Sequence, residues 1–213
     1  MPHQTWPTAM AVHVGIWMAM MVPMMLPSLI PTLSWYRRSV RGAHETSLDG
    51  LTALVVMGYL AVWAAIGLAV SAAGAGVMAA EMRWGDLAAW RPVAAGVVLL
   101  MAGGVQFTIW KARQLADWRD GPRRGGPPAP DALGAWLHGL GLGARCSLVC
   151  ASLMLALLAI GMMDLIAMAA VTLAIAGERL APASLRIERV AGVAIVAAGV
   201  LTVARGASRL VAG

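Results

Sequence analysis

Six apolar runs, separated by polar connections that carry arginine, constrain this chain more than any other feature. The runs cover residues 9–35, 51–78, 93–110, 147–163, 165–177 and 190–203. A helix needs about 20 apolar residues to cross a bilayer, so the first run is long and the fifth is short. In hydrocarbon the backbone must satisfy its own hydrogen bonds, which helices do. The runs therefore predict an all-α, polytopic transmembrane bundle of about six spans, multi-pass in a lipid bilayer.

The amino-acid composition agrees with a location in a lipid bilayer. Hydrophobic residues make up 60% of the chain and charged residues 12%, whereas soluble domains have about 45–50% and about 25%. The net charge of +6 could suggest nucleic acid, but the basic residues lie mainly in the connections, where membrane orientation explains them. We therefore predict no nucleic-acid partner.

The basic residues also predict an orientation. Twelve of the sixteen fall in the connections after the first, third and fifth runs, and the positive-inside rule makes these connections cytoplasmic. Both termini are then expected to face outward. Residues 1–7 contain no lysine or arginine, so the charged start of a secretory signal peptide is missing and the first run is expected to be retained.

One domain, residues 1–213, is expected. Its longest connection, 116–134, contains GPRRGGPPAP, a composition that cannot bury a core. We interpret it as a mobile cytoplasmic linker between a three-span front half and a three-span back half.

The first run concentrates methionine and proline in WMAMMVPMMLPSLIP, residues 17–31. Pro23, Pro27 and Pro31 recur every fourth residue and predict a kinked or tilted helix. Five methionines fall on two neighbouring helix faces, beside His13: Met18, Met20, Met21, Met24 and Met25. Methionine is a flexible apolar filler, but a cluster of thioethers also suits Cu(I). Both interpretations remain open.

The fourth run supplies a second sulfur group in RCSLVCASLM, residues 145–154. Cys146, Cys150 and Met154 recur every fourth residue and share one helix face. Cysteine also packs as a small apolar residue, so packing is again the alternative. Zinc fits less well than Cu(I), because zinc sites would leave the methionines without a role. The candidate soft-metal ligands are Met20, Met21, Met24, Met25, Cys146 and Cys150.

Two polar positions close to the fifth run have simpler explanations. Asp164 precedes the run and is expected to cap its helix. Glu178 and Arg179 end it and are expected to form a solvated helix end. The chain contains no Ser-His-Asp or H-E-x-x-H arrangement and no phosphate-binding G-x4-G-K-[ST] motif, so we do not expect an enzyme.

Several of these segments together resemble a family of uncharacterised bacterial proteins described as predicted metal-binding integral membrane proteins. The segments are WMAMMVPMMLPS at 17–28, GYLAVW at 58–63, the cysteine segment 143–154, GMMDL at 161–165, and Glu178 with Arg179. The resemblance covers nearly the whole chain and implies one multi-span domain in the bacterial inner (plasma) membrane. The family's most specific motifs, a Met-Met-x-Pro run and a cysteine cluster, correspond to Met20, Met21 and Pro23, and to Cys146 and Cys150, and the resemblance implies that the sulfur residues among them bind a metal. Many relatives carry a further cysteine where this chain has Val149, and a tryptophan where it has Ala151 or Ser152, so a metal site here would have fewer thiols or be lost.

Two classes of function follow. In the first, the protein binds a soft metal ion, Cu(I), between the first and fourth spans and transports it or delivers it to a metalloenzyme. In the second, it is a non-catalytic structural subunit or assembly factor of a larger membrane protein complex, and the methionines only pack.

Overall fold

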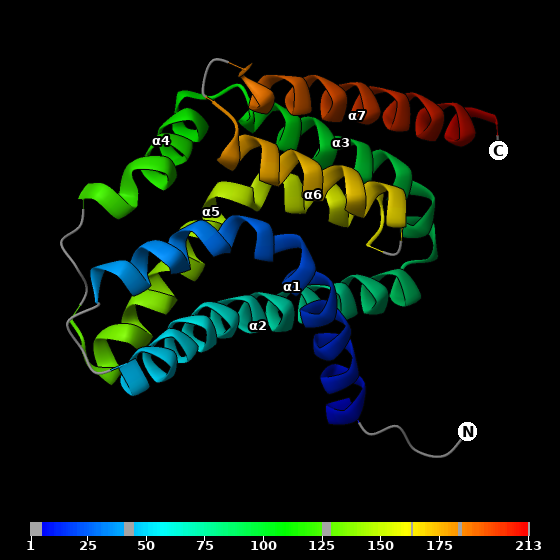
Figure 1. The fold of residues 1–213 in the computed structure, drawn as a ribbon. Coiled ribbons are helices and arrows are strands. Elements are labelled where there is room, and N and C mark those ends of the chain that lie inside the picture. Colours follow the sequence, from blue (N-terminus) through cyan, green and yellow to red (C-terminus); the bar gives the residue numbers. More distant parts are fainter. Residues whose placement is uncertain (1–5, 41–44, 125–128, 163, 183–184, 213) are drawn as a thin grey trace. The chain divides into compact units, whose positions relative to one another are not determined.

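The fold is all-helical over the residues that the computed structural model describes, which are 6–40, 45–124, 129–162, 164–182 and 185–212. Figure 1 shows the course of the chain. Its elements in order are α1 (Trp6–Ser39), α2 (Glu45–Arg83), the 3-10 helix η1 (Gly85–Trp90), α3 (Arg91–Val105), α4 (Ile109–Arg124), α5 (Ala132–Ile160), α6 (Leu165–Leu180) and α7 (Ile187–Ala212). A helix lies over each of the six apolar runs, so the all-α prediction is confirmed. Arg41, one of the basic residues after the first run, and Met163, at the end of the fourth run, lie outside the described residues.

The chain divides into two compact units that share α2, α4 and α5. The first unit comprises residues 1–77 and 120–147, and the second comprises 78–119 and 148–213. The first therefore contains α1, most of α2 and the beginning of α5. The second contains α3, most of α4, the end of α5, α6 and α7.

Helix α1 bends sharply at its central proline. Its two arms, Met10–Met25 and Pro27–Ser39, meet at 70°. Pro27 has no backbone N–H and its ring crowds the preceding turn, so the helix cannot run straight through this position. The kink that the prolines predict is confirmed. It leaves the methionines on the first arm.

In the first unit, glycines allow α2 and α5 to approach closely. A Cβ atom on Gly139 would lie 2.2 Å from the carbonyl oxygen of Val55, and one on Gly58 would lie 2.6 Å from that of Trp136. Gly143, one turn after Gly139, meets α2 in the same way at Tyr59, whose carbonyl oxygen would lie 3.0 Å away. Small residues four apart are what close helix pairs in membranes use. The two backbones are therefore in contact here.

In the second unit, α3 and α7 pack against each other in antiparallel directions. Gly96 faces Val203, whereas Gly103, two turns later on α3, faces Val196, earlier on α7. On α7, Gly192, Gly199 and Gly206 recur every seventh residue and each meets side chains of α3 or of the turn that follows it. A seven-residue repeat keeps one seam of a helix facing its partner.

Two helix boundaries differ from the sequence prediction. Helix α3 ends at Val105 rather than near Trp110, and a turn separates it from α4, where the hydroxyl of Thr108 accepts a hydrogen bond from the N–H of Lys111. Helix α5 begins at Ala132, fifteen residues before the predicted run, because the Leu- and Gly-rich stretch before the cysteines is helical too. The predicted linker 116–134 is helical up to Arg124, and its assignment as a linker stays a prediction.

The predicted cap of α6 is confirmed. The carboxylate of Asp164 accepts hydrogen bonds from the backbone N–H groups of Ile166, at 2.9 Å, and Ala167, at 3.0 Å. These N–H groups have no partner within the helix, so the aspartate satisfies donors that would otherwise be open.

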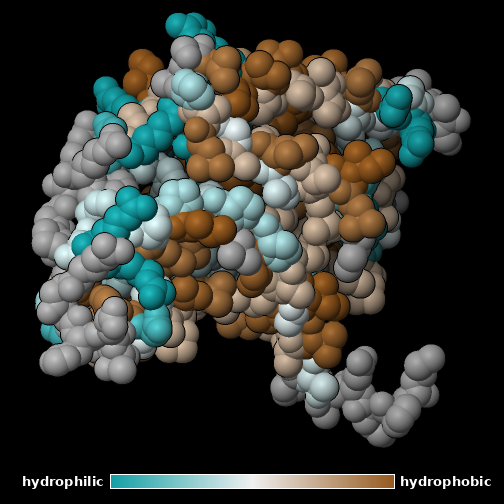
Figure 2. All heavy atoms as spheres, viewed as in Figure 1, coloured by the Kyte–Doolittle hydropathy of each residue, from teal (hydrophilic) through white to brown (hydrophobic). Residues whose placement is uncertain are grey.

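Among the described residues, four helices are long and apolar enough to cross a membrane, and the two arms of α1 would make a fifth crossing if they form one broken span. The four are Leu48–Arg83, Ala88–Val105, Ala132–Ile160 and Ile187–Leu210. Large apolar side chains on the outer face of α7, among them Val190, Val193 and Val200, are more than half exposed. Figure 2 shows this hydrophobic surface along α7.

Candidate metal centre

A thiol, a thioether and a phenol meet in the interior of the first unit. The Sγ atom of Cys146 lies 3.8 Å from the Sδ atom of Met25 and 3.0 Å from the hydroxyl oxygen of Tyr59. None of the three residues is more than 2% exposed. They come from α5, α1 and α2, and we call them the thiol site. The site therefore exists only when three separate helices of this unit are packed together.

Local features hold the first arm of α1 in place at the thiol site. The indole N–H of Trp17 donates a hydrogen bond to the carbonyl of Trp63 on α2, at 3.1 Å, and Gly67 leaves room for the Trp17 ring. At the other end of the arm, the hydroxyl of Ser28 donates to the carbonyl of Met25 at 2.9 Å, which satisfies a backbone acceptor next to the proline bend. The first bond ties this arm to α2, and the second lies within α1 at Met25 itself.

The structure distributes the other predicted ligands unevenly. Met21 and Met24 are buried on the same arm of α1, and Met20 is half-buried. Cys150 is buried one turn after Cys146 on α5, belongs to the second unit, and like Cys146 forms no disulfide. His13, at the start of the arm, is exposed. Of the six predicted ligands, the first unit brings Met25 and Cys146 into direct contact.

The donor atoms at the thiol site are suited to a soft monovalent ion. Thiolate–metal bonds are about 2.3 Å long in zinc sites, so two sulfur atoms 3.8 Å apart can both reach one ion of similar size. Thiolate and thioether donors favour Cu(I). One thiolate and one monovalent cation form a neutral pair, which a buried, apolar site can hold at low cost. Among the described residues, no group of three His, Cys, Asp or Glu side chains is placed to hold a metal.

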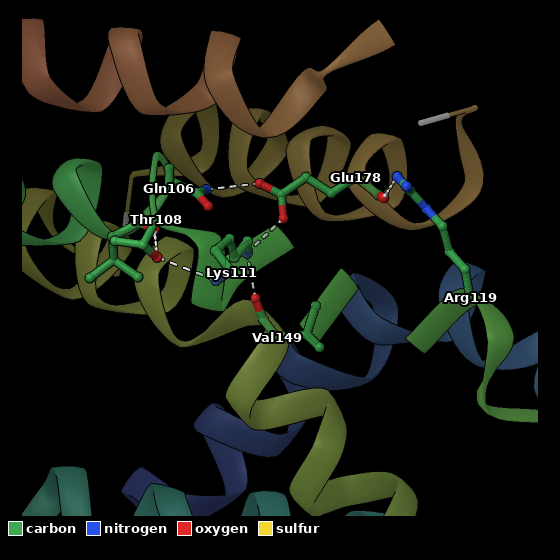
Figure 3. Close-up of polar contacts among 7 residues, drawn as sticks. Gln106, Thr108, Lys111, Arg119, Val149 and Glu178 are labelled. Carbon is green, nitrogen blue, oxygen red and sulfur yellow. Dashed lines mark hydrogen bonds and ion pairs between the residues drawn. The ribbon is translucent and has the colours of Figure 1, made fainter. Parts of the chain in front are cut away.

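The second unit contains a buried ion pair that sequence analysis did not predict. The Nζ atom of Lys111 lies 2.8 Å from Oε2 of Glu178, and the amide of Gln106 donates to Oε1 of the same carboxylate at 2.8 Å. Lys111 is 0% exposed and Glu178 is 1% exposed. Lys111 also donates to the carbonyl of Val149 on α5 (Figure 3). A buried pair of this kind is tolerated because both charges have close hydrogen-bond partners.

The expectation that Glu178 and Arg179 form a solvated helix end is wrong. Both are buried, and the guanidinium of Arg179 lies 4.2 Å from the ring centroid of Trp118 on α4. Arg119 donates to the carbonyl of Glu178 at 2.5 Å, which satisfies an open acceptor in the last turn of α6. Helix α4 therefore covers the end of α6, where Arg179 and the carbonyl of Glu178 contact it.

Two residues were missed for identifiable reasons. Tyr59 lies within GYLAVW, where a tyrosine among apolar residues gives no sign of a polar partner. Lys111 directly follows the predicted end of the third run, so it was counted among the basic residues of the cytoplasmic connection after that run. Its proximity to Glu178, 67 positions later, depends on how the helices pack.

These observations define a class: a helical protein with soft sulfur donors in contact in its interior. The family model of the copper chaperone PpoB2 matches residues 14–202, so the chain belongs to this copper chaperone family. The matched range includes the thiol site and the buried ion pair, and His13 lies outside it. No curated protein and no solved structure gives a significant match. The metal-related expectation is therefore confirmed at the level of a copper-related family.

Proposed function

We propose that this protein is a Cu(I) carrier that holds the ion between Cys146 and Met25 and delivers it to a copper-dependent enzyme. The observation that carries the proposal is the buried 3.8 Å contact between the Cys146 and Met25 sulfur atoms in a member of a copper chaperone family. The protein itself acts as a carrier, with no catalytic step of its own.

The chemistry of uptake and release follows from the two kinds of sulfur. Binding to Cys146 replaces the thiol proton, which leaves to water, so the bound state is neutral. Met25 adds a neutral thioether ligand and no further charge, and on release Cys146 takes up a proton as the ion leaves. Met20, Met21 and Met24 on the same helix are proposed to hand the ion along α1. Cys150, the sixth predicted ligand, belongs to the second unit, and its part in binding stays a prediction.

Copper content after purification tests the proposal. The protein is purified in mild detergent under reducing conditions, loaded with Cu(I) and desalted, and copper is measured by elemental analysis. We expect one tightly bound ion in the wild type, loss of that ion in Cys146→Ser, and weakened retention in Met25→Leu, which removes the sulfur but keeps a similar volume. Cys150→Ser, made separately, determines whether the second thiol belongs to the ligand set.

The matched control is Met57→Leu, at an exposed methionine on α2. It should keep full copper content, as should Cys150→Ser if the site is confined to Cys146 and Met25. Equal copper in wild type and Cys146→Ser, or none in either, would contradict the carrier proposal. The structural subunit or assembly factor would then be the remaining function.

We further propose that the protein spans the bacterial inner membrane six times with both termini outward. The proposal is supported by the exposed apolar surface of α7 and by the basic residues that end α1 and populate α4. Six crossings require α6, whose 16 residues extend about 24 Å, to cross a locally thinned bilayer. On this arrangement α4 lies on the cytoplasmic side.

Labelling from one side of the membrane tests this topology. Single cysteines are introduced into a Cys146→Ser, Cys150→Ser background at exposed positions near each terminus, Thr8→Cys and Ser208→Cys, and on α4, Arg113→Cys. In right-side-out spheroplasts, a membrane-impermeant maleimide is expected to label the first two at once and the third only after permeabilisation. Labelling of Arg113→Cys in intact spheroplasts would refute the orientation.

A further inference from the structure

We infer that Tyr59 is the positioning residue of the copper site: its hydroxyl donates a hydrogen bond to Cys146 Sγ and directs the Cys146 S–H group toward Met25 Sδ. This inference rests on the proposed function and deepens it, because it names a group outside the sulfur ligands on which the site depends. Its basis is the geometry of the thiol site, where one sulfur atom contacts both a phenol and a thioether.

The direction of each hydrogen bond follows from what the atoms can donate. A thioether sulfur has no proton, so the contact between Cys146 and Met25 must use the proton of the Cys146 thiol. That thiol has only one proton. The 3.0 Å contact with Tyr59 is therefore made by the phenol O–H donating to Cys146 Sγ. The result is a directed chain from Tyr59 through Cys146 to Met25.

The same series of hydrogen bonds prepares the site for the ion. Cu(I) binding breaks the S–H bond and forms a copper–sulfur bond, the proton leaves to water, and no atom is oxidised or reduced. The ion takes the place of the proton between Sγ and Sδ. The Tyr59 hydrogen bond stays in place and stabilises the negative charge that remains on sulfur, which an apolar interior alone would penalise.

Backbone packing fixes Tyr59 in this position. Gly58, next to it in sequence, lies against the carbonyl of Trp136, and Gly143 lies against the carbonyl of Tyr59 itself. Neither glycine could carry a Cβ atom without displacing backbone or side-chain atoms of the other helix. The backbone of Tyr59 is therefore held against α5, and its side chain is buried beside Cys146. Partners that orient a ligand from outside typically change metal affinity by about 10–100-fold when they are removed.

The test uses the only two tyrosines in the chain. Tyr59→Phe removes the proposed donor and keeps the ring. Tyr36→Phe is the matched control, because Tyr36 is also buried, stacks on His138, and its hydroxyl has no hydrogen-bond partner among the described residues. Both are made in a Cys150→Ser background so that Cys146 is the only thiol.

The first measurement needs no copper. The infrared S–H stretching band of the metal-free protein reports the hydrogen bonds of Cys146, and we expect it to shift in Tyr59→Phe and to stay in place in Tyr36→Phe. An unchanged band in Tyr59→Phe would overturn the inference, whatever the protein does with copper.

The second measurement is Cu(I) affinity, by competition with a chromogenic chelator. Tyr59→Phe is expected to bind about 10–100-fold more weakly than its parent, and Tyr36→Phe as tightly. Parent protein that binds Cu(I) through Cys146, with equal affinity in Tyr59→Phe, would overturn this inference alone. Parent protein that binds no Cu(I) would overturn the proposed function, and this inference with it.

Discussion

Lys111→Met is expected to lower the free energy of unfolding by about 3–5 kcal/mol, because it leaves the carboxylate of Glu178 charged and buried without its counterion. Gln106 still donates to that carboxylate, but a neutral amide cannot replace an ammonium group. Reversible unfolding in mixed detergent micelles, followed by circular dichroism, gives the difference.

Two further variants separate the buried charge from the loss of a lysine. Arg113→Met removes an exposed cation from the same helix and should have little effect. Lys111→Met combined with Glu178→Gln removes both charges and should recover much of the stability, since the amide can keep a hydrogen bond with Gln106. A single Lys111→Met as mild as Arg113→Met would show that the ion pair contributes nothing.

Gly139→Ala is expected to be the most damaging single-methyl change in the first unit. The new Cβ atom would lie 2.2 Å from the carbonyl oxygen of Val55, and the next two atoms it meets, within 3.0 Å, also belong to the Val55 backbone. A backbone cannot give way as a side chain can, so α2 and α5 must separate. We expect a loss of at least about 1–3 kcal/mol in unfolding free energy, together with weaker copper binding as Tyr59 moves away from Cys146.

Gly141→Ala provides the control two residues along the same helix. Gly141 is exposed and a Cβ atom there would meet nothing within 4 Å. Alanine is favoured over glycine in helices by about 1 kcal/mol, so this variant should be as stable as the wild type or more so. If Gly139→Ala also unfolds at or above the wild-type midpoint, α2 and α5 are not in backbone contact at this point.

Much of the secondary structure could be predicted from the sequence because the signals are local. Uninterrupted apolar residues dictate helices, Pro27 dictates a bend, and Asp164 dictates where α6 begins. The end of α3 was placed five residues too late, since the apolar residues Phe107, Ile109 and Trp110 continue past the turn that separates two helices.

The candidate site was predictable in its chemistry but not in its geometry. Clustered thioethers and thiols indicated a soft-metal site. Of the predicted ligands, Met25 and Cys146 are in direct contact in the first unit. Which methionine faces Cys146, and that Tyr59 joins them, depends on the rotation of three helices about their axes. Helix rotation is set by packing between distant segments, which a single sequence does not encode locally. Glu178 was misjudged for the same reason, because its partner Lys111 lies on another helix.

The antiparallel pair of α3 and α7 limits how this part of the chain can change. Atoms of α3 or of the turn after it occupy the space beside Gly192, Gly199 and Gly206. Val193 and Val200, each next in sequence to one of these glycines, are mostly exposed. Val196 and Val203, between these glycines, also face α3, so tolerance to substitution along α7 is expected to fall once in every helical turn. A chain under selection can replace the outward valines by other apolar residues, yet it can enlarge a seam position only if the facing residue becomes smaller in the same lineage.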